Sequence, residues 1–194
     1  MATEAVIQAI LDFWFGEPPG SYADRKPIWF GKQPDLDAEI RQRFGESYQQ
    51  DVAGQFTDWR ETPQGCLALI LLFDQFARNM FRDTAQMFAT DPQALELARF
   101  AVAQAYDQQL SPLERIFIYL PFEHSENRQD QVQSVELFQR LVETDPELAD
   151  VLDYAKRHQV VVDRFGRFPH RNKILGRDTT AEEAEFLTQP GSSF

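Results

Sequence analysis

The chain has 194 residues, of which 43% are hydrophobic and 26% charged, and its formal net charge is -12. This composition is typical of a folded globular protein that is long enough to bury a core without disulfide bonds. The negative charge disfavours binding of nucleic acid or anionic membranes over the whole surface. We therefore expect one domain spanning residues 1–194, with neither nucleic acid nor a membrane as partner.

The single cysteine and the short apolar runs indicate where in the cell the protein is expected. Cys66 is the single cysteine, so the chain has no internal disulfide and no thiolate zinc site. It lies in the apolar run 66–73, which favours a buried thiol and is far too short to span a bilayer. The first residues lack the basic region and cleavage site of a secretory signal. These features predict a cytoplasmic protein.

Four helix starts share one pattern, a capping residue followed by proline: Thr62-Pro63, Asp91-Pro92, Ser111-Pro112 and Asp145-Pro146. The side-chain oxygen accepts a free backbone N–H, and proline at the first helical position loses no needed donor. Ser111 with Glu114 and Thr180 with Glu183 also have the spacing of a capping box.

Further helices are expected over residues 4–15, 36–50, 128–142 and 181–187. The range 16–33 contains three prolines and is predicted to be an irregular connection. No stretch alternates between polar and apolar residues, so we expect no sheet. The sequence predicts an all-α domain of antiparallel helices joined by short loops.

Ionisable residues interrupt the apolar faces of three helices. After Pro63 the apolar stripe continues at helical spacing to Asp74, Gln75 and Arg78. The stripe after Pro112 continues to His124, and His158 lies on the inward face of the helix after Pro146. Because a buried charge is costly without a partner, these positions predict a polar cluster.

The range 164–177 carries five cationic residues, one histidine and no acid. Two interpretations stay open. In the structural one, Arg164, Arg167 and Arg171 pair with inward carboxylates such as Asp74 and Glu126 and hold the late loop in place. In the functional one, spare guanidinium groups bind a small phosphorylated or carboxylated ligand.

The functional hypothesis assigns ligand binding to six residues: Arg78, Asn79, Arg164, Arg167, Arg171 and Asn172. If the protein is a hydrolase, the acid–base candidates are Asp74, His124, Glu126 and His170. The same four side chains suit a metal ion, but their spacing and the nearby arginines disfavour that alternative. No phosphate loop, dinucleotide fingerprint or nucleophile elbow is present, so no cofactor is expected.

Four motifs resemble one family: Leu11-Asp12-Phe13-Trp14-Phe15-Gly16, Leu71-Leu72-Phe73-Asp74-Gln75-Phe76-Ala77-Arg78-Asn79, Tyr119-Leu120-Pro121-Phe122-Glu123-His124-Ser125-Glu126 and Arg164-Phe165-Gly166-Arg167-Phe168-Pro169-His170-Arg171-Asn172. Together they are similar to the uncharacterised bacterial family called domain of unknown function 924, over residues 11–187. Ala77 departs from the family pattern, which has proline there. The resemblance implies an all-α, tetratricopeptide-like superhelical domain without an established activity. A protein-interaction module is therefore the second functional hypothesis.

Overall fold

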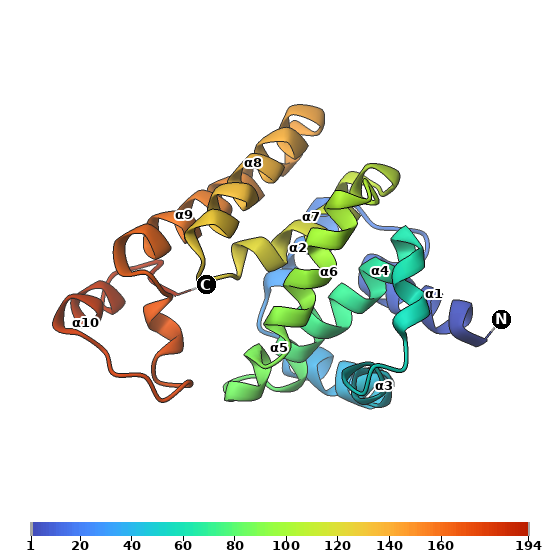
Figure 1. Cartoon of the computed structure of the whole chain (residues 1–194), viewed down its shortest axis with the longest axis horizontal. Helices are drawn as coiled ribbons and strands as arrows, with labels where there is room; N and C mark the ends of the chain where they lie inside the picture. The colour runs from blue at the N-terminus through green and yellow to red at the C-terminus, as the bar shows by residue number, and fades with distance from the viewer. Residues whose placement is uncertain (1, 194) are drawn as a thin grey trace. The chain divides into compact units, whose positions relative to one another are not determined.

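The computed structural model describes residues 2–193, and all regular structure in this range is helical (Figure 1). The prediction of an all-α fold is confirmed. The described chain forms two compact units, and each is treated by itself. Unit 1 comprises residues 2–82 and 86–121, and unit 2 comprises residues 83–85 and 122–193. The single domain expected over 1–194 stays a prediction.

Unit 1 contains the first six α-helices and most of the seventh. Its elements are α1 (Ala2–Phe15), α2 (Tyr22–Phe30), α3 (Pro34–Val52), η1 (Thr57–Glu61), α4 (Pro63–Ile70), η2 (Leu71–Phe76), α5 (Ala77–Met80), α6 (Asp91–Ala103), η4 (Asp107–Gln109) and α7 (Pro112–Glu123), whose last two residues belong to unit 2. A short 3-10 helix, η3 (Ala85–Phe88), lies where the chain passes between the units.

Unit 2 is built on two long helices, α8 (Arg128–Thr144) and α9 (Ala149–Phe165), which lie side by side as an antiparallel pair (Figure 1). The 3-10 helix η5 (Pro146–Leu148) connects them. The chain then passes through η6 (Pro169–Arg171) to α10 (Ala181–Leu187). Gly166 ends α9 with a φ of 71°, in the left-handed region that glycine adopts without a steric penalty.

The capping signals locate most helix starts correctly. Thr62 accepts a hydrogen bond from the Gly65 N–H at the start of α4, and Asp145 accepts one from Glu147 before α9. The Thr180–Glu183 capping box at α10 is confirmed. The start of α6 is shifted by one position, because Asp91 is already helical and its carboxylate binds Arg78.

The irregular connection predicted over 16–33 is wrong in its second half, where α2 forms. Ser21 caps this helix by accepting a hydrogen bond from the Asp24 N–H. Trp29 is buried and donates a 2.8 Å hydrogen bond to the main-chain oxygen of Trp14. Pro27 lies inside α2. Tertiary burial of the indole therefore outweighs the unfavourable propensity of an interior proline.

The helix that carries the predicted polar stripe runs from Pro63 to Met80 with a π-helical segment, η2, in its middle. All six residues of η2 are buried, Asp74 and Gln75 included. Ala77 continues the helix into α5. A π segment changes the helical register, and such segments are often found at functional sites.

Large aromatic rings form the core of unit 1. Trp14 is fully buried, and its ring lies 5.4 Å from that of Phe76 and 5.6 Å from that of Phe117 in edge-to-face contacts. Trp29 and Trp59 are also buried. All three tryptophans are therefore core residues, and the edge-to-face contacts of Trp14 add to the stabilisation from burial.

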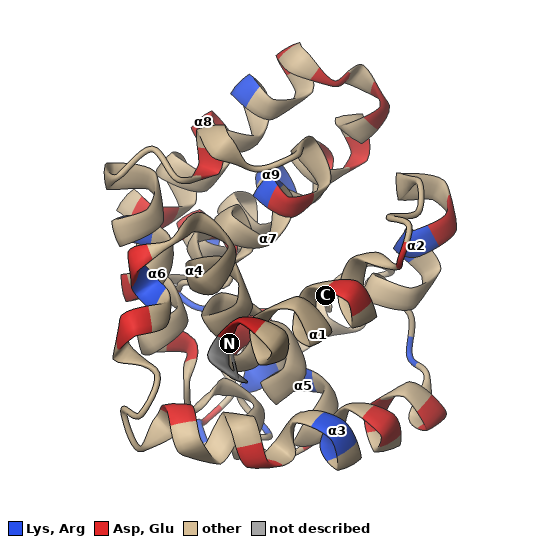
Figure 2. Cartoon of the chain, turned by 90° about the vertical axis from the view of Figure 1, so that its right-hand side faces the viewer, with Lys and Arg blue, Asp and Glu red and all other residues tan. Residues whose placement is uncertain are grey.

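Cys66 is also buried in unit 1, as predicted, and burial raises the pKa of its thiol to about 12. Both acidic and basic residues lie along α3 (Figure 2). Within residues 2–193, no helix has both the length and the apolar character needed to cross a bilayer.

Candidate functional site

Three predicted site residues, Asp74, Arg78 and Asn79, lie in unit 1 and have partners there. The Arg78 guanidinium lies 3.0 Å from the Asp74 carboxylate and donates hydrogen bonds of 2.8 and 3.1 Å to Asp91. Burial lowers the pKa of Arg78, but the carboxylates of Asp74 and Asp91 outweigh it, so the pKa is raised. Asn79 donates a 2.8 Å hydrogen bond to Asp37. These contacts join α3, α5, α6 and η2.

Unit 2 brings together all three histidines of the chain. The ring of His158 lies 6.4 Å from that of His124 and 5.4 Å from that of Phe168, which lies 5.6 Å from the ring of His170. The Arg171 guanidinium stacks over the Phe168 ring at 4.5 Å. We call His124, His158, His170, Phe168 and Arg171 the histidine cluster.

His158 is held in one orientation by two acceptors. Its Nδ1 lies 2.9 Å from the main-chain oxygen of Tyr154 and 3.1 Å from the Glu123 carboxylate. Both partners are acceptors, so Nδ1 carries the proton of the neutral ring. Burial lowers the pKa of His158 well below its usual range. His158 is buried, as its predicted place on the inward face of its helix requires, and Glu123 is a partner that the sequence did not indicate.

His170 is partly buried, and desolvation together with the nearby Arg171 charge lowers its pKa to about 4. A histidine whose pKa is lower in the folded chain opposes folding once the unfolded chain takes up the proton. Stability contributed by this site is therefore complete above pH about 6.5 and falls as the pH decreases towards about 4.

The substitution His170→Gln should reduce the loss of stability on acidification. Between pH 7 and about 4.5 the wild type should lose on the order of 2 kcal/mol more than the variant. Urea unfolding followed by far-UV circular dichroism at both pH values measures the difference. Equal losses for the two proteins would contradict the assigned direction of the pKa shift.

The acids of α10 pair with two of the predicted arginines. Arg167 donates hydrogen bonds of 2.6 and 2.9 Å to Glu183, and Arg164 donates one of 2.8 Å to Glu182. The Arg167 contact lowers the pKa of Glu183 to about 2. Arg164 and Arg167 therefore pair with carboxylates, as the structural interpretation expected, but the partners are Glu182 and Glu183 and not Asp74 or Glu126. The α10 acids are only 18 and 16 positions away in sequence, so a short loop brings the charges together.

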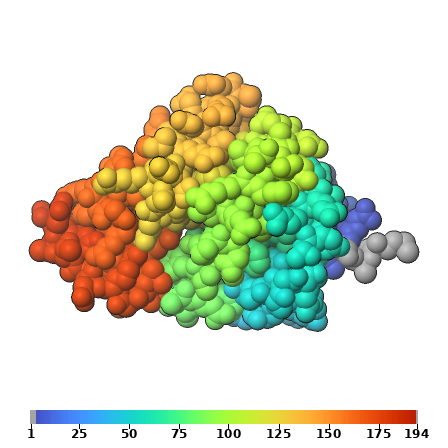
Figure 3. Space-filling model, viewed as in Figure 1, coloured from blue at the N-terminus to red at the C-terminus, as the bar shows by residue number. Residues whose placement is uncertain are grey.

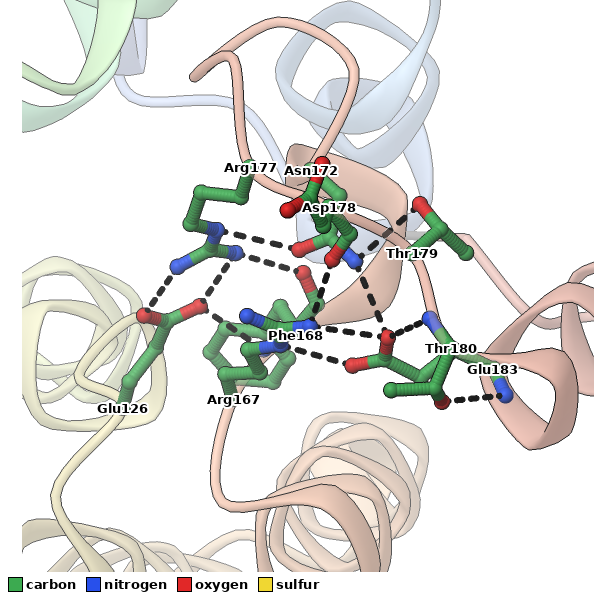
Figure 4. Close-up of polar contacts among 9 residues, drawn as sticks. All are labelled: Glu126, Arg167, Phe168, Asn172, Arg177, Asp178, Thr179, Thr180 and Glu183. Atoms are coloured by element: carbon green, nitrogen blue, oxygen red, sulfur yellow. Dashed lines mark hydrogen bonds and ion pairs between the residues drawn. The ribbon is translucent and has the colours of Figure 1, made fainter.

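Glu126 lies in the loop between α7 and α8, and its partner is Arg177 (Figure 4). The guanidinium donates hydrogen bonds of 2.7 and 3.0 Å to the two carboxylate oxygens, and the Phe168 N–H donates a third of 2.7 Å. Burial raises the pKa of Glu126, but these contacts outweigh it, so the pKa is lowered. A bidentate guanidinium and a backbone N–H together form a binding site for one carboxylate group.

Asn172 connects the two carboxylate sites (Figure 4). Its side chain is buried and donates a 3.3 Å hydrogen bond to Glu183, while its oxygen accepts a 3.0 Å hydrogen bond from Arg177. The orange to red residues of this part of the chain are closely packed against one another in the space-filling view (Figure 3). Asn172 therefore positions Arg177 from inside unit 2.

Arg177 is the main residue of this site that the sequence interpretation did not select. It belongs to the same cationic segment as the predicted arginines, which is the signal that could have included it. Its partner Glu126 is 51 positions away, and no local spacing indicates such a pair. Within residues 2–193, no three His, Cys, Asp or Glu side chains are arranged to bind one metal ion.

The fold and the polar contacts define an all-helical protein with a histidine- and arginine-rich cluster in its later part. The model of the family described as bacterial protein of unknown function (DUF924) matches residues 10–191, so the chain belongs to this family. A solved protein of unknown function from Agrobacterium tumefaciens is 40% identical, with a TM-score of 0.84 over 95% of this chain and 98% of that one. No curated protein matches the sequence significantly.

Proposed function

We propose that unit 2 binds a small carboxylated or phosphorylated ligand at the histidine cluster and the adjacent Arg177. One observation supports this proposal: the three histidines of the chain lie together with two guanidinium groups of a segment that contains no acid. A concentration of cationic and imidazole side chains on a chain of net charge -12 is typical of a site for an anion.

The roles within the proposed site follow from the contacts. Arg164 and Arg167 pair with the acids of α10, whereas Arg171 lies over the Phe168 ring beside the histidines and Arg177 pairs with Glu126, so the positive charge of the proposed site is assigned to Arg171 and Arg177. Because the pKa of His170 is about 4, its ring is neutral at pH 7 and offers one donor and one acceptor. A neutral ring leaves recognition of the negative charge to the guanidinium groups. Acid–base chemistry by His124, His170 and Glu126 remains a further proposal.

The substitution Arg177→Gln should weaken anion binding by about tenfold or more, because a charge-assisted hydrogen bond to a ligand contributes about 1.5–3 kcal/mol. Isothermal titration calorimetry with inorganic phosphate, acetate and citrate at pH 7 measures this. The matched control is Arg164→Gln, which changes an exposed guanidinium paired with the exposed Glu182 and should bind as the wild type does. Absence of binding in the wild type, or equal weakening in both variants, would contradict the proposal.

A protein-interaction role is the second candidate, and the surface of the α8–α9 pair favours it. Val132 on α8 is 46% exposed and Val160 on α9 is 65% exposed. Antiparallel helix pairs are the building block of tetratricopeptide-like repeats, and we therefore also propose a tetratricopeptide-like arrangement of the helices. The cytoplasmic location is a further proposal. Arg177→Gln separates the two candidates, since it leaves both valines unchanged.

A further inference from the structure

Glu126 and Arg177 form a carboxylate site that is filled by the chain itself. Two guanidinium N–H groups and the Phe168 N–H surround the carboxylate, and Arg171 adds an attractive charge nearby. We call the Arg177 guanidinium and the Phe168 N–H the oxyanion cradle. The three hydrogen bonds are those that a ligand carboxylate or phosphate group would accept.

Two contacts other than those with Glu126 hold the Arg177 guanidinium. Arg177 Nε donates to Asn172 at 3.0 Å, and Nη2 donates to the main-chain oxygen of Phe168 at 2.9 Å. Neither contact involves the Glu126 carboxylate. The cradle is therefore preorganised, so that little ordering is needed when another oxyanion enters it.

The Glu126 carboxylate is more exposed than the chain's comparable carboxylate, Glu183. The Glu183 side chain is 3% exposed and belongs to the capping box of α10, whereas the Glu126 side chain is 29% exposed and lies in a loop. Arg177 is 23% exposed. Because of this difference, we expect a ligand to replace the Glu126 carboxylate, whereas Glu183 keeps a fixed structural role.

We propose that Glu126 is an internal competitor that occupies the oxyanion cradle and is displaced by the carboxylate or phosphate group of a ligand. This inference rests on the proposed function and deepens it, because it names the atoms that bind the anion. Every ligand competes with Glu126 for the cradle, so simple anions such as phosphate bind the wild type weakly. A ligand that makes additional contacts binds more tightly.

The first experiment is chemical rescue of Glu126→Ala. Thermal unfolding at pH 7 is compared in sodium acetate and in sodium chloride at equal ionic strength. Acetate should raise the melting temperature of Glu126→Ala above its value in chloride, because it refills the cradle. The control, Glu182→Ala, removes an exposed carboxylate that faces no cradle and should show no acetate-specific rise. Equal responses of the two variants would overturn the proposal.

The second experiment keeps the side-chain volume, in case the alanine variant does not fold. Glu126→Gln should bind inorganic phosphate about tenfold or more tightly than the wild type, since the competing charge is gone. Unchanged or weaker affinity would overturn the competitor role even if the wild type binds phosphate. If acetate stabilises Glu126→Ala but the wild type does not bind phosphate, the proposed function is contradicted, while the cradle is still shown to accept an oxyanion.

Discussion

Replacing Arg78 with alanine should lower the free energy of unfolding by about 3–5 kcal/mol, because it leaves the buried Asp74 carboxylate and the partly buried Asp91 carboxylate without their shared cation. Asp74 is 1% exposed, and its carboxylate lies 3.0 Å from the guanidinium. Asp91, at the start of α6, loses two hydrogen bonds at the same time. The change therefore removes the ionic link that Arg78 makes between the π-helical segment and α6.

Urea unfolding followed by far-UV circular dichroism at pH 7 measures this loss. Arg157→Ala is the matched control, because Arg157 pairs with Asp153 on α9 and both side chains are more than half exposed. That surface pair should contribute less than about 1 kcal/mol. A loss as small for Arg78→Ala as for the control would show that Asp74 and Asp91 find other partners.

The second large effect is a gain in stability from Asp51→Asn. Asp51 lies near the end of α3 and is 8% exposed as a residue, and its Oδ2 has no hydrogen-bond partner. Burial raises the pKa of Asp51 to about 7. The last turn of a helix also disfavours a negative charge.

The sign of the pH dependence follows from the raised pKa. A carboxyl group that is more easily protonated in the folded chain supports folding at low pH, and this support is lost between about pH 4 and 7. Asp51→Asn should therefore add on the order of 3 kcal/mol at pH 8 and little at pH 4. Asp58→Asn, at an exposed position of η1, should change stability by less than about 0.5 kcal/mol. A gain that does not depend on pH would contradict this explanation.

Asp51 and His170 act in opposite directions over much of the same pH range. As the pH falls from about 6.5 to 4, protonation of the buried carboxyl group stabilises the chain while the histidine destabilises it. The wild type should therefore show a weak net dependence from these two groups. The single variants are needed to reveal each contribution.

The helices could be predicted from the sequence because their signals are local. Thr62, Asp145 and Thr180 each cap a backbone N–H within three residues, and these contacts are confirmed. The prediction of an irregular connection where α2 forms was wrong for the opposite reason. That helix depends on contacts of Trp29 with rings from distant parts of unit 1. Burial against distant segments leaves no pattern in the local sequence.

The candidate site was predicted only in part for the same reason. The cationic segment and the inward histidines were recognisable as unusual, and the structure places His124, His158 and His170 together in unit 2. The choice of partner for each guanidinium was not recognisable. Arg164 and Arg167 bind acids that follow them closely, whereas Arg177 reaches across 51 positions to Glu126.

The distribution of tryptophan and histidine between the two units provides each with its own natural probe. Trp14, Trp29 and Trp59 all belong to unit 1, and the three histidines all belong to unit 2. Indole fluorescence therefore reports on the first unit, and the C2-proton resonances of the imidazole rings report on the second. Without any label, denaturation followed by both signals would reveal whether the two units melt in one cooperative transition.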